Sequence, residues 1–362
     1  MISKYKDIRK RGSNYELLRV ISIFMVIILH CLGGYGKVLR NIEVWSLNFY
    51  GAVFFESFSI IAVNCFVFIA GYFQIKKDKV NIEKLIQLFM LTVFWYIVLY
   101  FIGIILGDVT FSIASFAFTV IPIMKGEVWY VNTYIILIIL SPYINKFLIS
   151  LNNKQYRKLL ILLISIFSII PTFLPISCNN DKGYGIVTFI LIYSIAGYIR
   201  LFKDEFNKDK KNYLFKWFLC SLTVFMLSLL SYKLINSSNA WGYNNIFNIL
   251  SAMYLFLYFR NIKIQSEIIN YLATFSFSIY IIHINPSIKN LIYNELLHFD
   301  KYYNNNFILI YIFIASLSIF IGCILLEFTR RLILSIVLKN KYSKNVIEKI
   351  KNKYIKDKYL EV

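Results

Sequence analysis

The chain has 362 residues, of which 59% are hydrophobic and only 16% are charged, and its formal net charge is +20. Because a soluble domain is rarely more than about half apolar, this composition excludes an ordinary soluble domain and indicates a membrane protein. The positive charge lies in short clusters between apolar runs, which argues against a nucleic-acid interface and is typical of the cytoplasmic loops of membrane proteins. The five cysteines are scattered without CxxC spacing, so neither a disulfide framework nor a metal site is expected.

Apolar runs long enough to form membrane-spanning helices follow one another along the chain. A helix needs about 20 mostly apolar residues to cross a bilayer. We therefore predict an all-α, polytopic membrane protein with about ten transmembrane helices, at residues 17–35, 51–73, 85–107, 128–149, 158–175, 184–201, 213–235, 243–260, 267–288 and 305–328. An eleventh apolar stretch, 111–124, is short and contains Pro122, so we expect it to be re-entrant or to lie on the membrane surface.

The distribution of charge predicts the topology. With ten spans and both termini cytoplasmic, 32 of the 39 Lys and Arg residues fall on the cytoplasmic side and seven fall outside, as the positive-inside rule requires. The chain then divides into a basic cytoplasmic N-terminal segment (1–16), a ten-helix membrane domain (17–329) and a basic cytoplasmic tail (330–362). The tail has apolar residues at helical spacing, so we expect it to form a helix on the anionic inner leaflet of the lipid bilayer.

Three ionisable residues lie along one stripe of the first predicted span. In a helix, the eleven residues from Arg19 to His30 bring both side chains to nearly the same face, about 16 Å apart along the axis. Glu16 lies about one turn before Arg19 on that face. An imidazole can act as base, acid or nucleophile near neutral pH, and ionisable residues inside a bilayer are usually functional. The alternative is a His30 that only hydrogen-bonds a neighbouring helix and an Arg19 that only reaches the membrane interface.

Polar residues of the second and ninth predicted spans are further candidates. By depth, Glu56 belongs to the same outer half of the membrane as His30, so the two could pair; alternatively, Glu56 lies close enough to the surface to be hydrated. In the ninth span a polar stripe on an otherwise apolar helix consists of Ser276, Tyr280, His283 and Ser287.

Two pairs of residues at the predicted membrane boundaries each allow two interpretations. Trp129 and Tyr130 open the fourth span, either as part of the aromatic belt at the interface or as rings at the mouth of a sugar site. Lys76 and Lys77 follow the second span, either as topology-determining charges or as contacts for a nucleotide phosphate.

Taken together, these features resemble the acyltransferase type 3 family of integral-membrane O-acyltransferases, in the branch found in exopolysaccharide and capsule gene clusters. The similarity begins with an acid, Glu16, three residues before Arg19, which is followed after ten further residues by His30. It continues, in order and spacing, with Ala70-Gly71-Tyr72, "VWYVNTYIILIILSPYIN" and "FSIYIIH".

Two departures from the family pattern concern the expected donor contacts. The family usually has Ser where this chain has Ala70, and many members have an arginine-rich segment where this chain has "VNIEKLIQLFMLTVF". Lys76 and Lys77 are therefore the candidates to contact the acyl-CoA donor in place of those arginines.

The resemblance implies transfer of an acyl group, expected to be acetyl, from a cytoplasmic acyl-CoA to a sugar hydroxyl of a surface polysaccharide or its lipid-linked precursor. The protein would lie in the bacterial cytoplasmic membrane. His30 would be the base or the acyl carrier, Arg19 would anchor the donor, and Glu16 would orient Arg19. The acceptor side or a proton relay would be formed by Glu56, His283, Tyr280, Trp129 and Tyr130. Acetyl-CoA is a substrate here, and no tightly bound cofactor or metal is expected.

Two rival functions belong to other classes. A flippase or transporter of lipid-linked oligosaccharides would use the intramembrane His and Glu as a proton relay, but such folds often show two related halves and this sequence shows none. A polysaccharide polymerase is expected to carry a large external loop, whereas the longest candidate gap, 107–128, is largely apolar. Consumption of acyl-CoA separates the transferase from both rivals.

Overall fold

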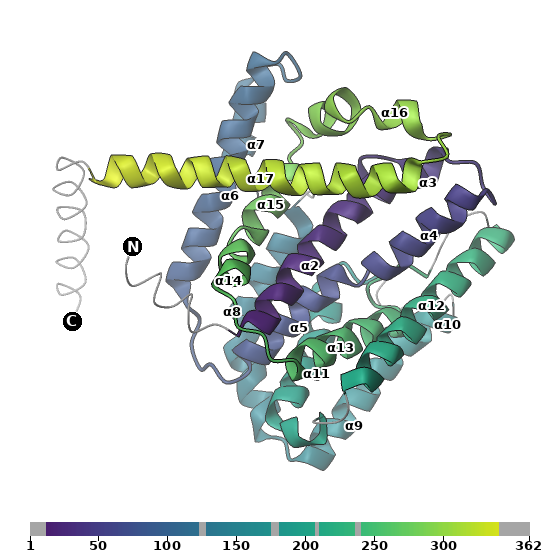
Figure 1. Cartoon of the computed structure of the whole chain (residues 1–362). Helices are drawn as coiled ribbons and strands as arrows, with labels where there is room; N and C mark the ends of the chain where they lie inside the picture. The colour runs from purple at the N-terminus through teal and green to yellow at the C-terminus, as the bar shows by residue number, and fades with distance from the viewer. Residues whose placement is uncertain (1–11, 123–127, 175–180, 207–209, 236–239, 340–362) are drawn as a thin grey trace, which may run out of the picture.

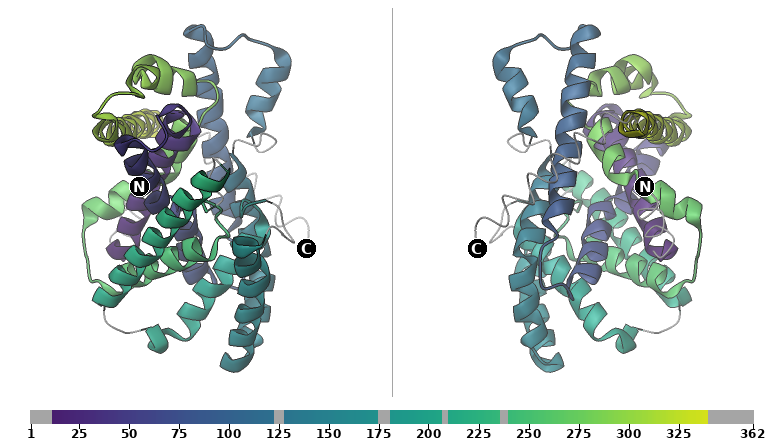
Figure 2. Two further views of the ribbon diagram at one scale, coloured as in Figure 1. Left: turned by 90° about the vertical axis from the view of Figure 1, so that its right-hand side faces the viewer. Right: turned by 90° about the vertical axis from the view of Figure 1, so that its left-hand side faces the viewer.

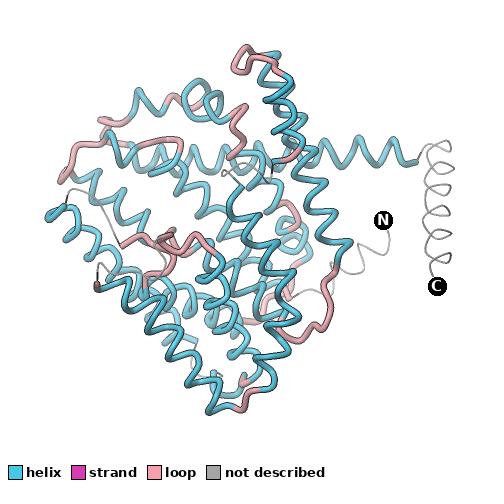
Figure 3. Tube along the Cα trace, turned by 180° about the vertical axis from the view of Figure 1, so that it is seen from behind, coloured by secondary structure: helices cyan, strands magenta, loops and turns pink. Residues whose placement is uncertain are grey.

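The computed structural model describes residues 12–122, 128–174, 181–206, 210–235 and 240–339, and within these ranges every regular element is helical (Figures 1 and 3). The elements η1, η4 and η6 are π-helical and η5 is a 3₁₀ helix. In chain order the elements are α2 (Ser13–Leu29), η1 (His30–Gly34), α3 (Val38–Asn41), α4 (Leu47–Ser59), α5 (Ala62–Gln74), α6 (Ile82–Ile105), α7 (Ile113–Val120), α8 (Trp129–Ser150), α9 (Asn153–Ile164), η4 (Ser165–Ile169), α10 (Ile170–Phe173), α11 (Ile186–Leu201), η5 (Lys203–Phe206), α12 (Lys210–Ile235), α13 (Ile246–Asn261), α14 (Glu267–Ala273), α15 (Ser276–His283), η6 (Leu291–Leu296), α16 (Phe299–Tyr302) and α17 (Ile308–Lys339).

Several helices begin where a short polar side chain caps the first turn. Ser46 and Asn81 accept hydrogen bonds from backbone N–H groups of α4 and α6. Asn152 and Gln155 form a reciprocal capping box at the start of α9. Because the first N–H groups of a helix have no partner within the helix, such caps fix where it begins.

Within the described residues, seven helical segments are long and apolar enough to cross a membrane, which makes this a multi-pass membrane protein. They are Ser13–Asn41, Leu47–Gln74, Ile82–Ile105, Trp129–Ser150, Asn153–Phe173, Asn212–Ile235 and Ile308–Val337. The predicted spans 184–201 and 243–260 correspond to α11 and α13, which have 16 residues each and lie largely buried among the other helices. The total of about ten spans stays a prediction.

Two of the predicted spans are not continuous helices. The second is interrupted at Ile60 and Ile61, between α4 and α5. The ninth, predicted over 267–288, is wrong as a single helix: it is broken at Thr274 and Phe275, and α15 ends at His283, before Pro286. A proline cannot continue a helix because its ring fixes φ and it lacks an N–H donor.

The apolar stretch 111–124 forms α7, an eight-residue helix that returns beside the end of α6 (Figure 2). The Tyr100 hydroxyl of α6 lies 2.6 Å from the Ser115 hydroxyl of α7. Eight residues span about 12 Å, much less than a bilayer core. The described part of this stretch is therefore too short to cross, while residues 123 and 124 lie outside the described residues.

The two predicted terminal segments are described only in part. Residues 1–11 of the N-terminal segment and 340–362 of the tail lie outside the described residues, and α2 already begins at Ser13. The last helix continues without a break from the predicted membrane domain through residue 330 to Lys339. It runs across the bundle, and its C-terminal end projects beyond it (Figure 1).

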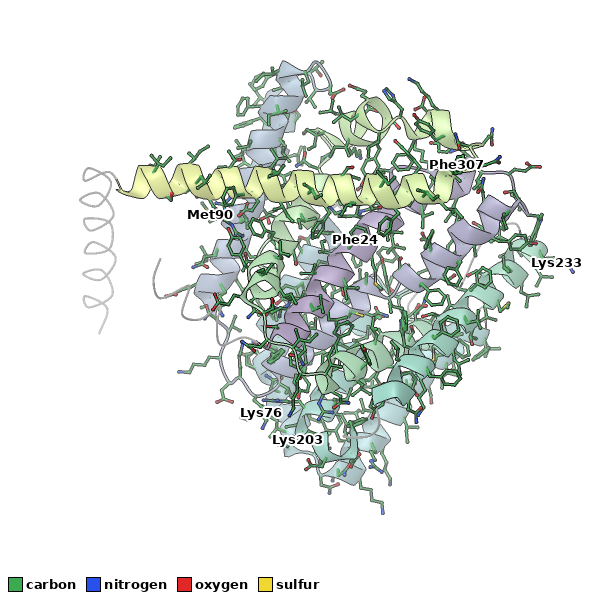
Figure 4. The ribbon with its side chains drawn as sticks, viewed as in Figure 1. Phe24, Lys76, Met90, Lys203, Lys233 and Phe307 are labelled. Carbon is green, nitrogen blue, oxygen red and sulfur yellow. The ribbon has the colours of Figure 1, made fainter. Side chains whose placement is uncertain are left out.

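The connections predicted to be cytoplasmic meet at one end of the bundle. Lys76 and Lys203 lie at this end, whereas Lys233 and Phe307 lie on the opposite side (Figure 4). Arg260 donates to the backbone oxygen of Lys203 at 3.0 Å. This arrangement agrees with the alternation expected from the charges; the orientation in the membrane stays a prediction.

Two further residues strengthen this end of the bundle. Arg157 of α9 forms an ion pair with Glu205 of η5 at 2.7 Å. A hydrogen bond from Asn153, followed in importance by the Arg157 contact, holds the pKa of Glu205 below its ordinary value despite some opposing desolvation. The turn after α11 is thus tied to the start of α9.

Gly71 marks the place where α5 packs most closely against α11. A Cβ atom at this position would lie 2.9 Å from both the Ala196 Cβ and the backbone oxygen of Tyr193. Because one of these atoms belongs to the backbone, the neighbour cannot move aside cheaply. The glycine of Ala70-Gly71-Tyr72 therefore allows the central helices to approach each other.

We expect Gly71→Ala to lower the free energy of unfolding by about 1–3 kcal/mol, since it overpacks this helix contact. Thermal unfolding of the purified protein in detergent measures the effect. Gly322→Ala in α17 is the matched control, because a Cβ there meets no atom within 4 Å. Equal unfolding temperatures for the two variants would contradict the close packing.

Candidate active site

Two histidines that are 253 residues apart in the sequence meet inside the bundle. Nδ1 of His30 lies 2.8 Å from Nε2 of His283, and Nδ1 of His283 lies 2.6 Å from the backbone oxygen of Ile279. The two rings are tilted, with centroids 5.0 Å apart. His283 is completely buried, whereas His30 is only partly buried. The hydrogen-bond partner of His30 is thus His283.

This chain of hydrogen bonds assigns the tautomers of two neutral imidazoles. A carbonyl oxygen only accepts, so Nδ1 of His283 must carry a proton and donate it to Ile279. Nε2 of His283 then accepts from Nδ1–H of His30. The remaining nitrogen, Nε2 of His30, has no proton and is available as a base or nucleophile.

His30 lies where the first helix changes its geometry. The α-helix α2 ends at Leu29, and residues His30–Gly34 form the π-helical turn η1. A π-turn adds a residue to the helical repeat and is frequent at functional sites. Two glycines make room for it: a Cβ on Gly34 would lie 3.0 Å from the His30 ring, and a Cβ on Gly36 would lie 2.2 Å from the Cys31 backbone oxygen.

His283 is positioned by the break between α14 and α15. Arg331 of α17 donates from Nη1 to the Thr274 hydroxyl at 2.8 Å and from Nη2 to the Thr274 backbone oxygen at 2.9 Å. Its guanidinium also lies 4.1 Å from the centroid of the Phe275 ring. The backbone group exposed by the break is thereby satisfied by a side chain of the last helix.

A buried carboxylate holds this arginine in place. Glu327 is fully buried and accepts hydrogen bonds from Nε of Arg331 at 2.8 Å, from Arg330 at 2.6 and 2.8 Å, and from the Trp95 indole at 3.0 Å. The sequence contained a signal of this cluster, an acid and two arginines within an apolar helix. The charge distribution places Arg330 at the start of the predicted tail, whereas here it belongs to this cluster.

A cavity of about 240 Å³ connects the level of Arg19 with the helix that carries His283. Its lining includes Arg19 of α2, Ala70 of α5, Tyr130 of α8, Thr274 and Tyr280. Tyr280 lies one turn before His283, and the centroids of their rings are 6.2 Å apart. Neither His30 nor His283 lines the cavity itself, so it leads from a cation to the helix that carries His283.

Glu16 forms an ion pair with Arg19. Nη1 of Arg19 donates to both carboxylate oxygens, at 2.7 and 2.9 Å. Within the described residues Glu16 is the only hydrogen-bond partner of Arg19, and the Arg19 side chain is 31% exposed. Its remaining N–H groups can therefore meet an anionic or carbonyl group of a ligand.

The side chains of Trp129 and Tyr130 pack in different surroundings. Tyr130 lines the Arg19 cavity, and its ring packs edge-on against Tyr280. Trp129 packs instead against Tyr184 and Tyr243, with ring centroids 4.5 and 5.5 Å away. Because successive residues of a helix point about 100° apart, the two neighbours belong to different sides of the site.

Glu56 belongs to the Trp129 side. Its carboxylate interacts electrostatically with Tyr184 and Tyr243, and an ideal Cβ on Gly33 would lie 3.6 Å from its Oε1. Oε2 of this buried residue has no hydrogen-bond partner in the described part of the chain. Glu56 thus lies beside the turn that carries His30 without pairing with it.

Lys76 and Lys77 are exposed on the turn after α5 and do not line the cavity. This turn is held by Asn145 of α8, which donates to the backbone oxygens of Gln74 and Lys77 at 2.9 and 2.8 Å. Among the described residues, no group of three or more His, Cys, Asp or Glu side chains is arranged to hold a metal ion.

A family model described as an acyltransferase domain matches residues 13–327, which is most of the chain. The chain belongs to the acyltransferase type 3 family. No curated protein and no solved structure gives a significant match. The protein is therefore a membrane acyltransferase, and the matched region contains both histidines, Arg19 and the residues that line the cavity.

The tautomer assignment in this acyltransferase is directly testable, because the chain has only three histidines. We expect ¹⁵N NMR of histidine-labelled protein to show His30 protonated at Nδ1 and not at Nε2 at neutral pH. His283→Ala removes the acceptor that selects this tautomer, so the His30 signals should shift toward the exchange-averaged pattern of a free imidazole.

His298→Asn is the matched control, since His298 lies in a loop with φ +45° and asparagine tolerates that conformation. This variant should remove one set of signals and leave the others in place. A His30 protonated at Nε2 in the unaltered protein would contradict the hydrogen-bond assignment.

Proposed function

We propose that this membrane acyltransferase transfers an acyl group, expected to be acetyl, from cytoplasmic acyl-CoA to a sugar hydroxyl. The acceptor would be a cell-surface polysaccharide or its lipid-linked precursor, and the location the bacterial cytoplasmic membrane. The observation that carries the proposal is the His30–His283 pair, which leaves one imidazole nitrogen of His30 unprotonated. A cavity lined by Arg19 reaches Tyr280, one turn before His283.

In the base mechanism, Nε2 of His30 takes the proton of the sugar hydroxyl while the hydroxyl oxygen attacks the thioester carbonyl. The carbon–sulfur bond then breaks, and the proton passes from His30 to the leaving thiolate. His283 holds the ring in the reactive tautomer throughout, as the third member of a catalytic triad does. His30 must be neutral before it can take a proton. Its hydrogen-bond acceptor, His283, is also neutral and so does not favour the protonated form of His30 as a carboxylate would.

The carrier mechanism uses the same nitrogen differently. Nε2 of His30 attacks the thioester carbonyl, the carbon–sulfur bond breaks, and an acyl-imidazolium forms that keeps its Nδ1–H toward His283. A sugar hydroxyl later attacks the acyl carbon, its bond to Nε2 breaks, and the hydroxyl proton passes to the thiolate. Protein incubated with acetyl-CoA alone distinguishes the two: an acetyl group found on His30 by mass spectrometry supports the carrier. A rate law that requires both substrates to be bound together supports the base.

The donor side of the proposed site is the Arg19 cavity. Arg19 would anchor the donor by charge-assisted hydrogen bonds, and Tyr130 and Tyr280 line the same cavity. The lining of this cavity is mostly apolar, so it suits the slender arm that carries a thioester better than the charged nucleotide, which would remain at the entrance.

The acceptor side would be formed by Trp129 and Glu56. Aromatic rings pack against the apolar faces of sugars. The Glu56 oxygen that has no partner among the described residues can accept a hydrogen bond from a sugar hydroxyl. Family membership favours this enzyme over the transporter with a proton relay.

The proposal predicts that the purified protein in lipid vesicles consumes acetyl-CoA. His30→Ala should lower the transfer rate about 10²- to 10⁴-fold, the usual effect of a general acid–base residue. Arg19→Ala should raise KM for acetyl-CoA about 10- to 100-fold with a smaller effect on kcat, since it removes a charged donor contact. Release of free CoA, followed by a thiol reagent, measures both.

His298→Asn serves again as the control and should turn over at the unaltered rate. If the unaltered protein neither binds nor consumes an acyl-CoA, the proposed donor is wrong. If His30→Ala retains full activity, the proposed catalytic nitrogen is wrong.

A further inference from the structure

Two arginines and two tyrosines converge at the end of the bundle where the Arg19 cavity begins. Arg200, in the last turn of α11, donates from Nη1 to the Tyr72 hydroxyl at 3.1 Å, and its guanidinium lies 4.8 Å from the centroid of the Tyr72 ring. Arg260, in the last turn of α13, and Tyr15 of α2 approach the same hydroxyl. Four helices thus contribute one polar side chain each to this arginine–tyrosine cluster.

Arg200 differs in its partner from the arginines that form ion pairs. Arg19 pairs with Glu16, Arg157 pairs with Glu205, and the two arginines of α17 share Glu327. Among the described residues Arg200 has no carboxylate partner, and its only hydrogen bond goes to a phenol. An arginine has five N–H donors in a planar fork, so most of those of Arg200 remain available to an anion.

The position of the cluster relates it to the donor cavity. Tyr15 lies one turn before Arg19 on α2, and Tyr72 lies two residues beyond Ala70 on α5, while Arg19 and Ala70 both line the cavity. The rings of Tyr15 and Tyr72 pack against each other with centroids 5.6 Å apart. The cluster therefore lies beyond Arg19, at the expected cytoplasmic entrance.

We propose that the arginine–tyrosine cluster of Arg200, Arg260, Tyr72 and Tyr15 binds phosphate groups of the nucleotide part of the donor. The inference rests on the proposed use of an acyl-CoA. It assigns to Arg200 and Arg260 the task for which the sequence offered Lys76 and Lys77, which are exposed and outside the cavity. Arginine suits this task better than lysine because its planar fork can bind a phosphate through two hydrogen bonds.

The same residues have a simpler explanation that the experiment must exclude. Cations in the last turn of a helix interact favourably with its C-terminal dipole, and cytoplasmic ends are rich in them. That explanation predicts a general attraction for anions shared by every arginine at this end. A specific phosphate site predicts instead that replacing one arginine weakens binding far more than replacing another of equal charge nearby.

The test is binding of adenosine 3′,5′-bisphosphate, which carries nucleotide phosphates but no thioester, to the full-length protein in vesicles. Arg200→Gln should weaken binding about 10- to 100-fold, and Arg200→Lys should restore only part of it. Arg157→Gln is the matched control, because Arg157 lies at the same end but is paired with Glu205. Thermal unfolding of each variant checks that the fold is retained.

Kinetics supply a second readout. The unaltered protein should have a much higher KM for S-acetylpantetheine, which lacks the nucleotide, than for acetyl-CoA. In Arg200→Gln this ratio should fall toward one, because only the donor with phosphates loses a contact. A purely structural role would raise both KM values or lower both rates together and would leave the ratio unchanged.

Three results would overturn the site: no binding of the bisphosphate, equal binding by the unaltered protein and Arg200→Gln, or equal weakening by Arg200→Gln and Arg157→Gln. The failure of the proposed function is seen separately. If the protein consumes acetyl-CoA but binds the bisphosphate equally well without Arg200, the proposed function holds and the proposed phosphate site is wrong. If the protein binds the bisphosphate through Arg200 but consumes no acyl-CoA, the phosphate site holds and the proposed function is wrong.

Discussion

The hydrogen bond between His30 and His283 is the contact on which the rest of the site depends. It joins two segments 253 residues apart, and each segment leaves regular α-helical geometry to make it. The first helix turns into a π-helix at His30, and the ninth predicted span breaks at Thr274 so that α15 ends at His283. Such departures cost stability, and they persist because the surrounding helices satisfy the exposed backbone groups.

The last helix, α17, stabilises the segment that carries His283. A fully buried carboxylate, Glu327, is expensive to desolvate, but two guanidinium groups and an indole N–H surround it. Arg331, which is held by Glu327, donates a hydrogen bond to the backbone oxygen of Thr274, at the break before the helix that carries His283. The histidine pair, the break and the last helix therefore form one connected hydrogen-bonded unit.

The two sides of the histidine pair differ in charge and in chemistry. On one side lie the Arg19 cavity and, beyond it, the two arginines that meet at Tyr72. On the other side lie Glu56 and the rings of Trp129, Tyr184 and Tyr243. A phosphorylated donor suits the first side, and a neutral sugar suits the second. This asymmetry gives the proposed transfer a direction across the protein.

The sequence by itself determined the helical class, the presence of several membrane-spanning helices and the spacing of Glu16, Arg19 and His30, because helical periodicity and apolar length are local properties of the chain. It also indicated His283 and Tyr280 as polar residues of one face. Only the tertiary structure decided that His283 contacts His30, that Trp129 and Tyr130 diverge, and that Arg200 meets Tyr72 while Lys76 and Lys77 are exposed. Those facts depend on how distant helices pack and where they break, which no local pattern specifies.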